Sequence, residues 1–256
     1  MNPRVRKSLV PILRFVLVLA FWIGVWAVAV WRTGYPELFP SPAAVAEKLW
    51  EMLGTSAYYR TVLHSFRNVA AGIAVSVAGG VLLAFLTWRV RLLRELIYPL
   101  MTVVKATPVA SFIVLALIWI GTSGIPAFIT GLIVLPVVWT NLDEGLRKQD
   151  PLLIEVAKAY RMPLSRRMRC LTLPSVRPYF LSALRTSLGL AWKAGIAAEV
   201  IARPRGAIGT AINDARQYIE YEEVFAWTLT VILLSLLIES GLMALLGRLE
   251  KRREAA

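Results

Sequence analysis

Apolar residues of this chain gather in six long runs that alternate with polar segments. The runs cover about residues 12–31, 66–88, 96–120, 125–141, 179–202 and 224–247. Most of them reach the length of about 20 apolar residues that a helix needs to cross a bilayer. The pattern therefore predicts an all-α, polytopic membrane protein in which residues 1–256 form a single transmembrane domain with six spanning helices.

The first run has two possible readings. It could be a secretory signal peptide, because Ala27, Val28 and Ala29 resemble a cleavage site. The run continues, however, into the bulky residues Val30 and Trp31. We therefore expect the segment to be retained as the first span.

Two other runs carry signals for packing. The second run places small residues at i+4 steps, at Gly72, Ser76, Gly80 and Ala84. Such a stripe lets two membrane helices approach closely, although glycine is also simply tolerated in these helices. The third run is interrupted by Lys105 and Pro108. The proline predicts a kink whose freed carbonyl is satisfied by neighbouring helices or by a water-filled cavity.

Basic residues are spread unevenly between the two sides of the predicted bundle. The chain carries 29 Lys and Arg against 16 Asp and Glu, and 57% of its residues are apolar. Counting Arg14 with the N-terminus and Arg67 with the loop after span one, nineteen of the basic residues fall in the two termini and in the loops after spans two and four, against seven in the opposite loops. Under the positive-inside rule this asymmetry predicts that both termini are cytoplasmic. It also explains the basic charge without nucleic acid as a partner.

The longest predicted inner loop, residues 143–177, contains two amphipathic helical patterns separated by Pro163. The apolar arc of the first pattern consists of Leu152, Leu153, Val156, Ala159 and Tyr160. The second pattern repeats Leu164, Met168 and Leu171 at i, i+4 and i+7. An apolar face outside the bilayer needs another surface to cover it. Physical chemistry leaves open whether that surface is lipid headgroups or a groove on a cytoplasmic protein.

This loop resembles the EAA loop of permease subunits in binding-protein-dependent ABC importers. The motif has Glu-Ala-Ala, a glycine six residues after the Glu, and Ile-x-Leu-Pro ten residues after the glycine. Its first element is matched by Glu155, Val156 and Ala157, and its last by Leu171, Thr172, Leu173 and Pro174. Arg161 stands at the glycine position. We expect Pro163 to supply the break between the two helices instead.

The resemblance extends over most of the chain and points to one branch of these permeases. Residues 39–42 (Phe-Pro-Ser-Pro), residues 64–67 (His-Ser-Phe-Arg), Pro108, and Trp192 followed by Glu199 stand in the right order. Together they are similar to the nitrate/sulfonate/taurine branch.

The resemblance implies a function and a set of partners. The chain would form the solute path for a small oxyanion, sulfonate or vitamin precursor, delivered by an external binding protein across a bacterial inner membrane. It would pair with a second copy or a close relative, and two cytoplasmic ATPases would receive the helix of residues 155–162. The coupling residues so implied are Glu155, Val156, Ala157, Tyr160, Arg161, Pro163, Leu173 and Pro174.

The chain carries no G-x-x-x-x-G-K-[ST] sequence, so it lacks the loop that cradles nucleotide phosphates. We therefore expect that this chain is not an enzyme and binds no cofactor directly. ATP would bind and be hydrolysed on the separate ATPase subunit.

Three charged residues in or near the predicted spans are candidates for the solute path, namely Lys105, Lys193 and Glu199. A charge at this depth is costly unless it faces the bundle interior, pairs or reaches the interface. The two lysines could give a path for an anionic solute a positive lining. Alternatively, Lys105 reaches the headgroups and Lys193 pairs with a glutamate of another helix. Lys193 and Glu199 are six positions apart, which excludes a simple pair within one helix.

Three other function classes compete with the importer. An ion-coupled secondary transporter could use Lys105, Lys193, Glu199 and Glu239 as a relay, and its uptake would follow an ion gradient. A membrane enzyme would need catalytic residues clustered at one face, and one cysteine, one histidine and scattered carboxylates do not supply such a cluster. A scaffold that moves no solute would be distinguished by transport assays in vesicles.

Overall fold

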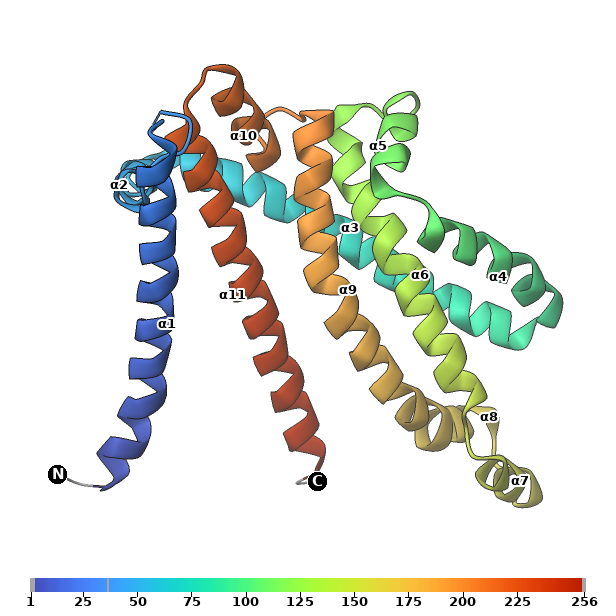
Figure 1. Cartoon of the computed structure of the whole chain (residues 1–256). Coiled ribbons are helices and arrows are strands. Elements are labelled where there is room, and N and C mark those ends of the chain that lie inside the picture. The colour runs from blue at the N-terminus through green and yellow to red at the C-terminus, as the bar shows by residue number, and fades with distance from the viewer. Residues whose placement is uncertain (1–2, 36, 255–256) are drawn as a thin grey trace. The chain divides into compact units, whose positions relative to one another are not determined.

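The structure is a computed structural model that describes residues 3–35 and 37–254, and the regular elements of these residues are all helices (Figure 1). The chain divides into two compact units. The first contains the described residues up to Tyr59 together with Ala211–Thr230, and the second contains Arg60–Thr210 together with the described residues from Val231 onward. The all-α fold expected from the apolar runs is confirmed.

Aromatic contacts hold the first unit together. It contains α1 (Pro3–Thr33), α2 (Pro42–Leu53), the start of α3 (Ser56–Arg89), most of α10 (Ile208–Gln217) and the start of α11 (Tyr221–Glu254). The rings of Trp26 and Phe225 stack with centroids 5.9 Å apart, and those of Tyr58 and Trp227 stack at 5.2 Å. The hydroxyl of Tyr58 also donates to the hydroxyl of Thr230 at 3.2 Å.

The second unit is built on α6 (Ile125–Arg147) and α9 (Leu173–Ala202), which run side by side (Figure 1). The small-residue stripe of α3 packs against α6. A methyl group added at Gly72 would lie 2.5 Å from the carbonyl oxygen of Ala127, and one at Gly80 would lie 2.9 Å from Val138. All four residues of the stripe are buried, which confirms that the stripe is a close packing surface.

The predicted third span is divided into α4 (Arg91–Ala106) and α5 (Val109–Leu117), which meet at an angle of 107°. Proline at position 108 lacks the amide hydrogen that would continue the helix, so the chain breaks where a kink was expected. The two halves pack on different cores. Met101 of α4 joins a cluster around Trp139, whereas Ile113 of α5 joins a cluster around Ile125 and Ala198.

The number of spans differs from six when only length and apolarity are considered. Four helical segments of the described residues qualify, namely Val16–Thr33, Ser56–Arg89, Thr122–Arg147 and Tyr221–Ala244. The bent pair of α4 and α5 makes a fifth if it counts as one span. The predicted fifth span lies in α9, a continuous helix of 30 residues. Arg185 and Lys193 interrupt its apolar sequence, and it is not among the helices that qualify. The count of six therefore stays a prediction.

Candidate functional site

The predicted inner loop, residues 143–177, is mostly helical. Its first residues complete α6, which ends at Arg147, and a short helix α7 (Pro151–Ala159) follows. The side chain of Asp150 caps α7 by accepting a hydrogen bond from the amide of Leu152 at 2.9 Å. Proline at the first helical position lacks only an amide hydrogen that would have no partner inside the helix.

The turn after α7 is centred on Arg161 and not on Pro163 as expected. Arg161 has a φ of 46°, the left-handed conformation that glycine adopts most easily. Its amide donates to the carbonyl of Lys158, and the amide of Met162 donates to the carbonyl of Ala157, both at 2.9 Å. This pair of hydrogen bonds is a Schellman motif, which ends the helix before Pro163 is reached.

Pro163 begins the second half of the loop. It is the N-cap of α8 (Leu164–Arg167), which continues through a π-helical turn at Met168–Thr172 into α9. The second amphipathic helix predicted after Pro163 is therefore present. Leu173 and Pro174 lie in the first turn of α9 and are exposed. π-helical turns occur often at functional sites because they change the direction in which neighbouring side chains point.

The apolar arc predicted for α7 is its exposed face. Leu152 is 69% exposed, Val156 52% and Tyr160 82%, whereas Ala157 on the other side is 2% exposed. Glu155 and Arg161 are exposed as well. Large apolar side chains on a short exposed helix form a surface suited to a partner.

Both ends of this loop are tied together by a contact that the sequence analysis did not identify. The side-chain amide of Gln149 donates to the carbonyl of Leu146 at 3.0 Å. The hydroxyl of Thr172 donates to the carbonyl oxygen of the same Gln149 side chain at 3.2 Å. Both Gln149 and Thr172 are buried, so the loop closes on a polar contact shielded from water.

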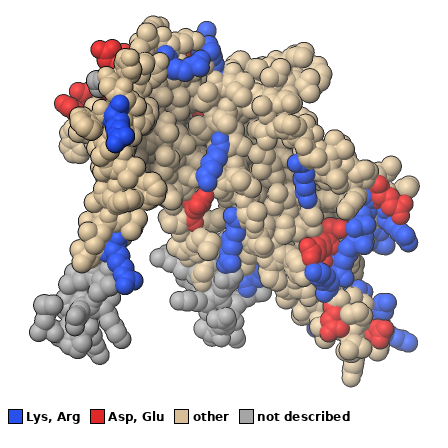
Figure 2. Space-filling model, viewed as in Figure 1, with Lys and Arg blue, Asp and Glu red and all other residues tan. Residues whose placement is uncertain are grey.

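Charged side chains on this face of the second unit gather around α4, α6, α7 and α8 (Figure 2). One of them is Lys148, directly after α6, which lies 2.6 Å from the carboxylate of Glu144. The hydrogen bond to Glu144 raises the pKa of Lys148 above its ordinary value.

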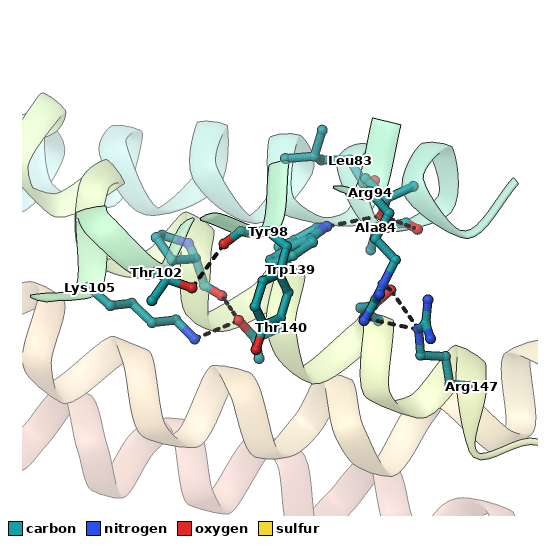
Figure 3. Close-up of polar contacts among 12 residues, drawn as sticks. Leu83, Ala84, Arg94, Tyr98, Thr102, Lys105, Trp139, Thr140 and Arg147 are labelled. Atoms are coloured by element: carbon teal, nitrogen blue, oxygen red, sulfur yellow. Dashed lines mark hydrogen bonds and ion pairs between the residues drawn. The ribbon is translucent and has the colours of Figure 1, made fainter. Parts of the chain in front are cut away.

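The three candidates for the solute path lie in different surroundings. Lys105 donates to the hydroxyl of Thr140 at 2.6 Å (Figure 3). Lys193 of α9 lies 3.7 Å from the carboxylate of Glu239 in α11, with side chains 63% and 45% exposed. The alternative of a pair between helices is therefore the one observed for Lys193. Glu199 is fully buried.

Gly189 makes room for the Lys193 pair. It precedes Lys193 by one helical turn, and a methyl group added there would overlap the carboxylate of Glu239. The ion pair leaves both charged groups partly exposed on the α9 and α11 face of the second unit. At the depth of a membrane such a face requires water or another protein subunit next to it.

Comparison with known proteins gives the family. Residues 76–255 match the family described as binding-protein-dependent transport system inner membrane component. The chain is 27% identical to the taurine transport system permease protein TauC of Escherichia coli (strain K12), over 96% of this chain and 90% of that protein. It is also 27% identical to the riboflavin transport system permease protein RibX of Chloroflexus aurantiacus, over 100% of this chain and 96% of that protein.

A solved structure supports the fold. The crystal structure of an amino acid ABC transporter with histidines superposes with a TM-score of 0.61 and 16% identity, over 77% of this chain and 93% of that chain. The match to the family spans most of the chain, including α6, the loop with α7, and α9. The chain therefore belongs to the family of inner membrane components of binding-protein-dependent transport systems, and it is a multi-pass permease subunit of an ABC importer.

Proposed function

We propose that this permease couples solute transport to ATP hydrolysis through α7 and the turn at Arg161, which dock in a groove on a separate cytoplasmic ATPase subunit. The observation that carries this proposal is the exposed apolar face of α7. Leu152, Val156 and Tyr160 are uncovered on a helix whose ends are fixed by a capping carboxylate and a Schellman motif. A rigid helix loses little conformational freedom on docking, which favours a specific partner.

The uneven charge supports a protein partner on the cytoplasmic side. The excess of Lys and Arg in the loop of residues 143–177 and in both termini favours a cytoplasmic position for these segments. The coupling surface would consist of α7, the Arg161 turn and the exposed first turn of α9. Its exposed residues would be Glu155, Val156, Tyr160, Arg161, Pro163, Leu173 and Pro174, and the buried Ala157 would support this surface from the other side of α7. ATP would be bound and hydrolysed on the partner, and no cofactor would bind this chain directly.

The other subunits of the proposed importer are those expected for a member of this family. The permease would pair with a second copy or a close relative in the bacterial inner membrane, with residues 1–256 acting as one transmembrane domain of six spans. Two ATPase subunits and an external solute-binding protein would complete the importer. The ion-coupled alternative has no support among the relatives named above, each of which is a transport system permease protein.

We further propose that Lys193 and Lys105 lie along the solute path, which suits a small oxyanion, sulfonate or vitamin precursor. The two relatives named above support this range, because their names refer to taurine, which is a sulfonate, and to riboflavin, which is a vitamin. Lys193 and Glu239 could exchange their mutual ion pair for contacts with a solute. The burial of Glu199 favours a role in holding the helices together over contact with the solute.

The docking surface can be tested by purification in mild detergent. The tagged permease should co-purify with an ATPase subunit, detected by ATP hydrolysis. Val156→Asp places a charge in the apolar face and should lower the co-purified ATPase activity about tenfold or more, as expected for an interface anchor. Glu155→Arg should also lower the co-purified ATPase activity. Lys158→Gln, on the charged side of α7, is the control. A monodisperse permease that never carries an ATPase, or a Val156→Asp variant that keeps all of it, would overturn the proposal.

A further inference from the structure

A buried carboxylate joins α4 to α6 close to the coupling loop. Asp143 of α6 has a side chain only 9% exposed and lies between two arginines. The guanidinium of Arg94, in α4, donates to both carboxylate oxygens at 3.1 and 3.2 Å, and that of Arg147, one turn further along α6, lies 3.2 Å from it (Figure 3). Forked hydrogen bonds between arginine and carboxylate fix the relative orientation of the two groups as well as their distance.

A second contact joins the same two helices about three turns away along α4. Thr140 accepts the hydrogen bond from Lys105 and donates to the carbonyl of Pro136 at 2.6 Å. Between the two contacts, Tyr98 of α4 lies against the ring of Trp139, with centroids 6.3 Å apart. The indole of Trp139 in turn donates to the hydroxyl of Thr87 in α3 at 3.0 Å. The α4 helix is therefore attached to α6 along most of its length.

The α5 helix lacks these attachments to the second half of α6. Its buried residues Ile113 and Ala116 pack against Ile125 and Ile129, in the first half of α6, and against α9. The chain between α4 and α5 contains Thr107 and Pro108, where the two helices diverge by 107°. The two halves of the third predicted span thus belong to different parts of the bundle, and the chain bends between them.

We infer that Asp143 is a positioning residue for coupling, which clamps α4 to the end of α6 so that both follow α7 as one body. Asp143 lies eight positions before Pro151, the first residue of α7. A displacement of α7 would be passed to α4 through the Asp143 clamp, and the chain would bend at Thr107 and Pro108. The inference rests on the proposed docking of α7 for the source of the motion, whereas the clamp itself can be measured in the isolated permease.

The test uses pairs of spin labels read by electron paramagnetic resonance, in a background where Cys170 is replaced by serine. One pair joins exposed positions Leu96 of α4 and Lys148 after α6, and the other joins Leu96 and Val114 of α5. In the isolated permease, Asp143→Asn should broaden the distance distribution of the first pair. Glu95→Gln, which removes the exposed Arg91–Glu95 ion pair of the same helix, should leave it narrow.

The second part of the test uses the permease in complex with its co-purified ATPase. Trapping with ATP and vanadate should change the Leu96–Val114 distance, which crosses the break, and leave the Leu96–Lys148 distance between α4 and α6 unchanged. In Asp143→Asn, trapping should instead change the Leu96–Lys148 distance and leave the Leu96–Val114 distance unchanged. An unchanged narrow distribution in Asp143→Asn, or a wild-type α4–α6 distance that moves on trapping, would overturn the inference. If Asp143→Asn does not fold, Arg94→Lys carries the same test, because it keeps the charge and loses the forked hydrogen bonds. Failure of the docking proposal would appear separately, as the absence of any response to ATP.

Discussion

The carboxylate of Glu199 accepts a 2.8 Å hydrogen bond from the hydroxyl of Ser65, which lies 134 positions earlier in the chain. The same oxygen of Glu199 accepts from the amide of Gly209 at 3.1 Å, and the oxygen of Ser65 accepts from the amide of Ile208 at 2.9 Å. Both side chains are fully buried. The first amides of a helix have no partner within it, so these two residues fix the start of α10 against α3 and α9.

Replacing Glu199 by alanine should therefore destabilise the protein. The substitution leaves the buried Ser65 hydroxyl and the amide of Gly209 without their acceptor, which costs about 2 kcal/mol. Thermal unfolding in detergent would measure the loss, and hydrogen exchange should accelerate at Ile208 and Gly209. Glu199→Gln keeps an acceptor oxygen and should lose less than Glu199→Ala. Equal melting temperatures and equal exchange in the alanine variant and the wild type would contradict this role.

The stripe of small residues on α3 offers a pair of matched substitutions. A methyl group at Gly72 would meet the backbone of Ala127 at 2.5 Å, whereas one at Gly79 would lie 3.5 Å from the nearest side-chain atom of Leu135. Backbone cannot move aside as a side chain can, so Gly72→Ala should lower the melting temperature in detergent. Gly79→Ala should be neutral or slightly stabilising, because alanine favours the helix by up to about 1 kcal/mol. Similar effects of the two substitutions would contradict the close approach of α3 and α6.

Local patterns were sufficient to predict the helices and this stripe, because helical periodicity is written into consecutive residues. They were not sufficient for the break at Pro108. The proline marks the position, but the 107° angle depends on which core each half meets, Met101 in one and Ile113 in the other. Likewise, α9 was counted as a span from its apolar run, although Arg185 and Lys193 interrupt that run and the helix is not among those that qualify by length and apolarity.

The contacts around the coupling loop could not be predicted for a related reason. Asp143 follows the fourth apolar run and was assigned to a loop, while its partner Arg94 lies 49 positions earlier. Gln149 and Thr172 are 23 positions apart and belong to no motif. Polar pairs at such separations are fixed by the packing of helices and leave no periodic signal. The position of Arg161 was identified by resemblance, but its left-handed backbone required the structure.

The turn at Arg161 predicts opposite effects for two glycine substitutions. Arg161→Gly should stabilise the end of α7 by about 1 kcal/mol, because glycine adopts a positive φ without the steric cost paid by other residues. Glu155→Gly, in the interior of the same exposed helix, should destabilise it by a similar amount. Hydrogen exchange of the amides of Arg161 and Met162, which close the Schellman motif, would measure both effects. Faster exchange in Arg161→Gly would contradict the strain assigned to this turn.

Substitutions in the ion pair of Lys193 and Glu239 would distinguish a purely structural contact from a solute-binding one. Lys193→Glu replaces the ion pair by two neighbouring carboxylates and should lower both stability and transport, because like charges repel. The double exchange of Lys193→Glu with Glu239→Lys restores an ion pair between α9 and α11. If the lysine at position 193 lines the path for an anion, the exchange should recover the melting temperature but not the uptake into vesicles. The uptake would be measured with the solute retained by the co-purified binding protein and identified by mass spectrometry. Full recovery of both stability and uptake would assign the pair a structural role alone and remove Lys193 from the path.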